Sequence, residues 1–258
     1  MNVEEDPIEI VAVGAHPDDV ELGIGGTLAK LTRSGIRTGI IDITNAEPTP
    51  LNEKYRSPDD FDEDYDATRK REAQKAAEIL GVERITDIGL PNRRLFDNFE
   101  ARCKLATIFR AWRPKVVIIM FGKTLMASPD HYQAQLITEA AIFYSRLTKW
   151  SKYFEDLPVH RITSLLYFPV RFIGLHPDNY TSFFIDITNT VDLKERAILC
   201  YKSQGFDPDK KQQGLRHFPS VILSWNRNLG SQIGVEYAEH LVSPSPLRID
   251  DFNYFMKK

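Results

Sequence analysis

The residues best suited to chemistry lie together in the segment Gly14-Ala15-His16-Pro17-Asp18-Asp19-Val20-Glu21. An apolar run before it, residues 8–13, predicts a buried β-strand, and leucines at helical spacing after it predict a helix over residues 22–34. The polar side chains are therefore expected on a strand-to-helix turn, where open α/β sheets bind ligands. We expect His16 and Asp19 to converge on one cation, since an imidazole and a carboxylate are typical zinc ligands. Asp18 then points elsewhere and is a candidate general base.

The competing interpretation of this turn is a helix cap. Aspartate is a good N-cap residue and is favoured at the N-terminus of a helix. One aspartate is enough for a cap, however, and a cap does not account for a histidine and two adjacent aspartates beside a strand end. The residue types therefore favour a metal site.

A second polar turn follows another apolar run, residues 115–120, and leads into Ser128-Pro129-Asp130-His131. Both turns follow apolar strands, so both should lie on the same edge of a parallel sheet. His131 is then the natural third ligand for the ion held by His16 and Asp19. Two histidines and one carboxylate, with a position left for water, are typical of a catalytic zinc site. The alternative is that His131 only begins a helix and binds nothing.

The remaining histidines give weaker signals. His176 precedes a proline and an aspartate, as His16 does, but it follows no strand, so we expect a surface loop, with substrate contact as the alternative. His160, His217 and His240 have no polar partners nearby in the sequence and are expected to be structural or exposed.

Two further patterns have ordinary explanations. Arg69, Lys70 and Arg71 lie in a predicted helix beside a long loop and are typical of a solvated face, although one arginine directed at the sheet edge could bind a substrate hydroxyl or acid group. The glycines of residues 23–26 lack the G-x-G-x-x-G spacing of a dinucleotide site, so helix packing explains them better.

Composition limits the class of protein. The 258 residues suffice for one large α/β domain, and 42% apolar with 27% charged residues is ordinary for a globular protein. No apolar run approaches the ~18 residues of a membrane span, and a net charge of −3 gives no support for nucleic-acid binding. The acidic N-terminus shows no signal-peptide pattern, and Cys103 and Cys200 are expected to be reduced, so we expect a cytoplasmic protein.

Strand and helix signals alternate along the chain. Further strands are predicted at residues 38–44, 84–88, 115–120, 162–168 and 183–187. Further helices are predicted at residues 66–80, ended by Gly81, and at 99–112, 131–147, 191–204 and 226–237. This rhythm predicts an α/β fold with a mainly parallel, Rossmann-like sheet and helices on both faces, in a single domain over residues 1–258 with an elaborated C-terminal part. The loop of residues 45–65 is long enough to suggest a functional role.

These motifs resemble the PIG-L/LmbE-like de-N-acetylase family, zinc hydrolases that remove acetyl from N-acetylglucosamine-type substrates. The resemblance rests on residues 15–22, 25–27, 47–50, 69–73, 77–82, 90–92, 129–131, 200–204 and 234–239. It covers nearly the whole chain, and the motif at residues 15–22 is the most specific part. The last two segments are most similar to a bacterial branch that includes bacillithiol-pathway deacetylases, which act on N-acetylglucosaminyl malate.

The resemblance implies roles for particular residues. His16, Asp19 and His131 would bind zinc, and Asp18 would be the general base. Arg69 matches a family arginine near the substrate, and Glu47 and His176 are the other expected substrate contacts. The implied partner is a small amino-sugar conjugate, and related proteins suggest a homo-oligomer.

Ser128 departs from the family pattern, which has histidine there, in His-Pro-Asp-His. That histidine is implied to stabilise the oxyanion or protonate the leaving amine, oriented by the residue that matches Asp130. A serine hydroxyl is far too weak an acid to replace it, and a general acid contributes ~10²–10⁴-fold to rate. We therefore expect Asp18, Asp130 and Ser128 in a zinc-dependent catalytic site. The alternative is a catalytically impaired zinc-binding member that binds a sugar or a partner protein.

Overall fold

The computed structural model describes residues 6–47, 62–122, 127–169, 180–206 and 218–248, in which a seven-stranded sheet has the order β3-β2-β1-β4-β5-β7-β6. The strands are β1 (Ile10–Gly14), β2 (Thr38–Asp42), β3 (Glu83–Ile85), β4 (Val116–Met120), β5 (Ser164–Phe168), β6 (Thr181–Asp186) and β7 (Ala238–Ser243). Neighbouring strands from β3 through β5 pair in parallel, and β7 runs antiparallel to both β5 and β6. The mainly parallel α/β sheet is therefore confirmed.

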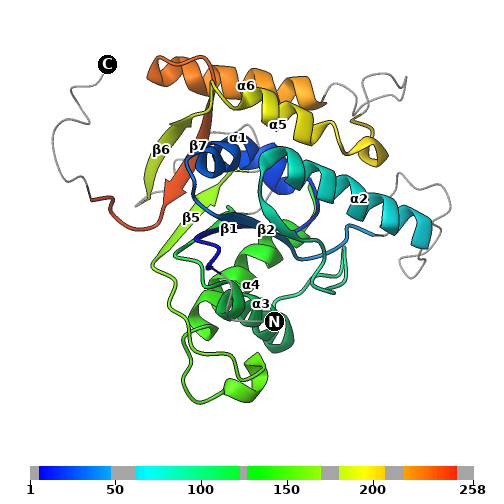
Figure 1. The fold of residues 1–258 in the computed structure, drawn as a ribbon, viewed down its shortest axis with the longest axis vertical. Helices are drawn as coiled ribbons and strands as arrows, with labels where there is room; N and C mark the ends of the chain where they lie inside the picture. Colours follow the sequence, from blue (N-terminus) through cyan, green and yellow to red (C-terminus); the bar gives the residue numbers. More distant parts are fainter. Residues whose placement is uncertain (1–5, 48–61, 123–126, 170–179, 207–217, 249–258) are drawn as a thin grey trace.

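Helices cover both faces of the sheet (Figure 1). They are α1 (Asp19–Arg33), α2 (Glu63–Leu80), α3 (Phe99–Trp112), α4 (Asp130–Tyr144), α5 (Val191–Ile198) and α6 (Phe218–Ile233), with short 3₁₀ helices η1 (Ser151–Phe154) and η2 (Lys202–Gln204). One layer contains α1, α2, α5 and α6, and the other contains α3 and α4. Strands covered on both faces read as continuous apolar runs, as β4 does with Val-Val-Ile-Ile-Met.

The strand order reverses between β1 and β4. The chain builds outward from β1 to β2 and β3, then returns to the other side of β1 to add β4 and β5. The loops that leave β1 and β4 therefore diverge to opposite sides of the sheet and leave a crevice at the carboxyl ends of the strands. This crevice is where both polar turns predicted from the sequence lie.

The glycines after the first turn allow close packing of α1. A Cβ at Gly23 would lie 2.3 Å from Cδ2 of Phe168 on β5, and one at Gly26 would lie 2.8 Å from Cδ1 of Ile187. Glycine is needed at these positions because the Phe168 and Ile187 side chains occupy the space. This confirms the packing interpretation for Gly23 and Gly26, whereas a Cβ at Gly25 would meet only an ordinary contact at 3.5 Å.

The C-terminal part differs from the prediction. The helix predicted at residues 226–237 is confirmed over residues 226–233, but its bounds are wrong: α6 begins at Phe218 and ends at Ile233, before Gly234 with φ 76°, and β7 follows at Ala238. Strand β7 was not predicted because its sequence, Ala-Glu-His-Leu-Val-Ser, contains polar residues that interrupt the apolar pattern. Glu239 is completely buried there, where its carboxylate accepts hydrogen bonds from the Gly26 and Thr27 amides and pairs with Lys194 Nζ at 2.6 Å.

Two other predicted elements are too long. The helix predicted to residue 204 ends at Ile198 and is followed by η2, and the strand predicted to residue 88 ends at Ile85. Both cysteines are free, and Cys103 is buried. Among the residues that the structure describes, no helix has the length and apolar character needed to cross a membrane.

Candidate active site

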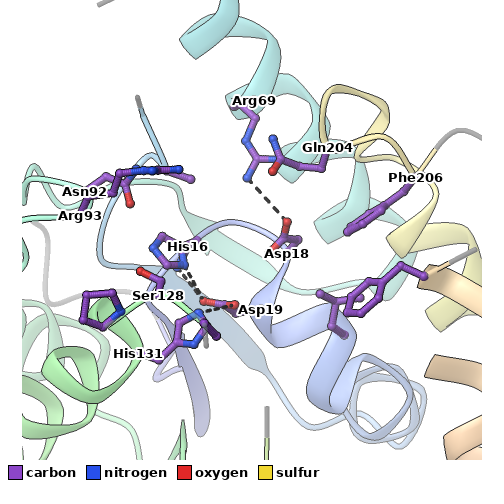
Figure 2. A pocket seen from close by; sticks show the side chains of 15 residues that line it. His16, Asp18, Asp19, Arg69, Asn92, Arg93, Ser128, His131, Gln204 and Phe206 are labelled. Carbon is purple, nitrogen blue, oxygen red and sulfur yellow. Dashed lines mark hydrogen bonds and ion pairs between the residues drawn. The ribbon is translucent and has the colours of Figure 1, made fainter. Parts of the chain in front are cut away.

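Side chains from the two polar turns meet at the crevice between β1 and β4 (Figure 2). His16, Asp18 and Asp19 lie where β1 passes into α1, and Ser128 and His131 lie around the start of α4. The structure therefore brings together residues more than a hundred positions apart, as their placement after parallel strands predicts. All five line one cleft with a volume of about 660 Å³, which is a typical size for a small-molecule site.

His16, Asp19 and His131 form a possible metal site. One ligand atom from each lies within 4.8 Å of the others. Nδ1 of His16 is 3.3 Å from Asp19 Oδ2, and Nε2 of His131 is 3.4 Å from Asp19 Oδ1. Ligands placed about 2.0–2.1 Å from zinc in a tetrahedron lie about 3.3–3.4 Å apart. The two histidine–carboxylate separations are of this size, although they involve different oxygens of Asp19, and the donor set fits zinc in type.

The charges of this cluster also suit a cation. Burial raises the pKa of Asp19, but the two imidazoles outweigh it and hold that pKa well below its usual range. Burial lowers the pKa of His16, but hydrogen bonds to Asp130 and Asp19 outweigh it and raise the pKa to about 10. The residues alone thus hold a proton on His16 at neutral pH, where a metal ion would take its place.

The Asp130 carboxylate contacts the candidate ligand His16 on the ring nitrogen that faces away from Asp19. Its side chain is 1% exposed, and Oδ2 lies 3.3 Å from Nε2 of His16 while it accepts the Arg93 amide at 2.5 Å. A carboxylate at Nε2 leaves Nδ1 of His16 to face Asp19, as in carboxylate–histidine–metal arrangements. Asp130 therefore contacts His16 through its carboxylate, and its amide donates to Ser128 Oγ at 3.3 Å.

Asp18 points away from the three candidate metal ligands, toward Arg69 (Figure 2). Arg69 is buried on α2, donates to the Pro17 carbonyl at 2.7 Å, and places Nη2 3.8 Å from Asp18 Oδ2. Burial raises the pKa of Asp18 to about 8, against the lowering effect of Arg69. A carboxylate with a raised pKa can take and return a proton near neutral pH.

The cap interpretation of the first turn is wrong for Asp18. The residue occupies the N-cap position of α1, but its side chain makes no capping hydrogen bond. Its φ of 110° is unusual for a residue with a side chain and costs free energy. The turn thus holds Asp18 in a strained conformation that directs its carboxylate into the cleft. Asp19 Oδ2 instead accepts the His16 amide at 2.8 Å, which closes the turn.

A buried network of charged side chains packs against the start of α1, next to the turn that carries Asp18. Arg84 on β3 donates to both oxygens of Asp42 on β2, at 2.7 and 2.9 Å, and contacts Glu21 of α1. The Tyr201 hydroxyl donates to Glu21 at 2.5 Å, and the Arg69 guanidinium lies 5.4 Å from the centre of the Tyr201 ring. The network therefore joins β2, β3 and α1 to the residue that faces Asp18.

Sequence reasoning missed part of the cleft wall. The additional lining residues are Leu22, Ala46, Asn92, Arg93, Ala127, Pro129, Gln204, Phe206 and Phe218. Asn92 and Arg93 lie in the segment between β3 and α3, and β3 is also a parallel strand of this sheet, so a third strand end was an available signal. Gln204 and Phe206 lie in the segment after α5. This segment does not follow a strand, so the expectation that sites form at the carboxyl ends of strands could not identify it.

The other expected substrate contacts have mixed outcomes. Arg69 lines the cleft, so the alternative in which one arginine of that segment faces the sheet edge is correct. Glu47 is buried beside the cleft but does not line it, although Ala46 does. His176 lies outside the described residues. Of the weaker candidates, His160 contacts the Pro114 carbonyl and His240 contacts Ser182, as expected for structural residues.

The fold and the cleft define an α/β protein with a candidate catalytic metal site at the topological switch point of its sheet. The chain belongs to the PIG-L family: the family model described as GlcNAc-PI de-N-acetylase matches residues 11–142. That stretch runs from β1 through α4 and includes both polar turns.

Individual relatives match over most of their length. The chain is 26% identical over 232 residues to a diacetylchitobiose deacetylase from Thermococcus kodakarensis, covering 90% of this chain and 81% of that protein. It is 26% identical over 264 residues to a 1D-myo-inositol 2-acetamido-2-deoxy-alpha-D-glucopyranoside deacetylase from Actinosynnema mirum, with 90% and 86% covered. The crystal structure of the conserved protein TT1542 from Thermus thermophilus superposes with a TM-score of 0.73 at 32% identity, covering 94% and 97%.

Proposed function

We propose that this protein is a zinc-dependent de-N-acetylase that removes acetyl from an N-acetylglucosamine-type conjugate. The single observation that carries the proposal is the His16–Asp19–His131 cluster with Asp18 beside it in one cleft. Two relatives are named for deacetylation of amino-sugar conjugates, which supports the same reaction class here. Two histidines and one carboxylate favour zinc among the divalent ions.

His16, Asp19 and His131 would hold the ion. When bound, it would polarise the acetamide carbonyl and acidify a coordinated water. Asp18 lies outside the ligand set and accepts the proton of the attacking water as the oxygen–carbon bond forms. It returns that proton to the nitrogen as the carbon–nitrogen bond breaks, which releases acetate and a free amine. Arg69 holds the Asp18 carboxylate in place for both transfers.

The cleft suits a sugar substrate. Polar groups for orienting hydroxyls come from Arg69, Asn92 and Gln204, and an apolar wall comes from Leu22, Phe206 and Phe218. Ligand sites commonly combine such apolar lining with a few polar groups. The non-reacting part of the conjugate would lie between Asn92 on one side of the cleft and Gln204 and Phe206 on the other (Figure 2).

The test is amine release from a panel of conjugates. Zinc-loaded protein is incubated with N-acetylglucosamine, diacetylchitobiose, N-acetylglucosaminyl inositol and N-acetylglucosaminyl malate, and primary amine and acetate are both quantified. We expect equal amounts of amine and acetate from at least one conjugate, and none from the metal-free protein. Bound zinc with no release from any conjugate would contradict the proposal and favour a sugar-binding or partner-binding role.

A further inference from the structure

Arg93 is a cleft cation that no described protein group neutralises. Its exposed side chain lines the same cleft as the metal cluster, and its guanidinium makes no hydrogen bond or ion pair with any described residue. Arg69, by contrast, donates to the Pro17 carbonyl and faces Asp18. Figure 2 shows Arg93 on the side of the cleft where His16 and Ser128 lie, across from Gln204 and Phe206.

The backbone of Arg93 is held in an unusual conformation. Its φ of 61° is left-handed, which is unfavourable for a residue with a side chain. The conformation directs the Arg93 amide at Asp130 Oδ2, and the same oxygen contacts His16 Nε2. Such strain persists where the surroundings fix it, and it is common at functional sites. The Arg93 backbone is therefore linked through Asp130 to His16, a candidate metal ligand. The Arg93 side chain stays unpaired within the described part of the chain.

Amide hydrolysis creates a negatively charged oxygen that the Arg93 guanidinium could stabilise. As water attacks the acetamide carbon, the carbonyl electron pair moves onto its oxygen, and preorganised donors around that oxygen lower the barrier. Ser128 offers one neutral hydroxyl in this part of the cleft. A guanidinium offers up to two parallel N–H groups and a full charge, and it keeps its proton at all working pH values.

We propose that Arg93 is a further catalytic residue, whose guanidinium donates hydrogen bonds to the acetamide oxygen while that oxygen carries negative charge. The inference rests on the proposed function. Arg93 neither gains nor loses a proton in the reaction: the water proton passes to Asp18, the electron pair returns from oxygen as the carbon–nitrogen bond breaks, and Asp18 protonates the amine. Arg93 acts by charge and position alone.

The test compares Arg93→Ala and Arg93→Lys with Arg94→Ala, a matched change at an exposed neighbour that does not line the cleft. Removal of one such donor lowers kcat by ~10²–10³-fold, with little change in KM, because the interaction is made only in the transition state. The kcat of Arg93→Lys is expected to lie between those of Arg93→Ala and the parent, because lysine keeps the positive charge but loses the two parallel N–H groups of the guanidinium. Zinc content, measured by elemental analysis, is expected to stay unchanged in all three variants.

A binding measurement makes the test independent of turnover. The probes are N-acetylglucosamine and a methylphosphonamide of glucosamine, whose tetrahedral anionic phosphorus group resembles the addition intermediate. Arg93→Ala is expected to weaken the phosphonamide by about as large a factor as it lowers kcat, and to leave N-acetylglucosamine binding near the parent value.

The outcomes are distinguishable. An active parent with Arg93→Ala equal to Arg94→Ala in kcat and phosphonamide affinity overturns the inference and leaves the proposed function intact. A raised KM with unchanged kcat, and equal weakening of both probes, assigns Arg93 to ground-state substrate binding and also overturns it. A zinc-loaded parent that neither releases amine nor binds the phosphonamide overturns the proposed function and this inference together.

Discussion

Asp130 gives the sharpest test of how the candidate metal site is built. Its Oδ2 contacts both His16 Nε2, at 3.3 Å, and the Arg93 amide, at 2.5 Å, and its side chain is almost completely buried. Carboxylates in this position fix the orientation and proton arrangement of the ligating imidazole, and their loss lowers metal affinity by about 10–100-fold. That range corresponds to about 1.4–2.8 kcal/mol of binding free energy.

Two substitutions separate charge from contact. Asp130→Asn keeps an oxygen acceptor for both partners and removes the charge, so we expect zinc affinity to fall by about 10-fold. Asp130→Ala removes the acceptor and leaves the Arg93 amide without this partner. We therefore expect a loss near 100-fold and a free energy of unfolding lower by about 1–3 kcal/mol.

The assay is competition for zinc against a chromogenic chelator, with thermal unfolding of the metal-free variants measured in parallel. Asp192→Asn, the same chemical change at an exposed site on α5, is the matched control. A zinc Kd for Asp130→Ala equal to that of Asp192→Asn would refute the reasoning, because His16 would then be oriented without Asp130.

Three further changes probe the catalytic groups and the packing of α1. Asp18→Asn is expected to retain zinc and lose parental amine release, because an amide cannot accept a proton from water; parental turnover would make Asp18 structural. Ser128→His is expected to raise kcat by ~10²-fold with little change in KM or zinc content, because an imidazole there would add a second acid for the leaving amine beside Asp18; equal, substantial rates in parent and variant would mean that Asp18 already supplies this contribution. Gly23→Ala would place a Cβ 2.3 Å from the Phe168 ring and is expected to cost about 1–3 kcal/mol of stability by overpacking. Gly25→Ala is its control, since its nearest contact would be an ordinary 3.5 Å; equal melting temperatures would contradict the packing argument.

The part of the fold between β1 and α4 was predictable because its signals are local. Continuous apolar runs mark β1 and β4 as doubly covered strands, and Gly81, with φ 73°, ends α2 where the sequence predicts. The two polar turns were predictable from a related signal: each lies between a buried parallel strand and the helix that follows it. Strand direction alone then places His16 and His131 on one edge.

The C-terminal part was less predictable because long-range contacts determine it. β7 contains Glu239, whose charge is compensated by Lys194 and by two amides of α1, and no local pattern shows this. Gly234 was a usable signal for the end of α6, since a glycine with positive φ commonly follows a helix. The predicted helix instead continued past Gly234 to residue 237.

The same distinction holds within the site. The ligand candidates and Asp18 follow strands and carry chemistry in their residue types, so spacing was enough to single them out. The wall formed by Gln204 and Phe206 depends on how the segment after α5 returns to α2, where Glu72 accepts hydrogen bonds from the amide and hydroxyl of Ser203. The contact between Asp130 and His16 also joins two turns and could be found only in three dimensions.

Zinc titration of metal-free protein, with bound metal and acetate release followed in the same samples, tests the His16–Asp19–His131 site most directly. Acetate release by the parent is expected to rise in proportion to bound zinc and to level off at one ion per chain. His131→Ala is expected to lose both the bound zinc and the activity, while His160→Ala, which alters a histidine outside the cleft, is expected to match the parent. Stoichiometric zinc at parental affinity in His131→Ala, or full acetate release by the parent without zinc, would contradict the assignment.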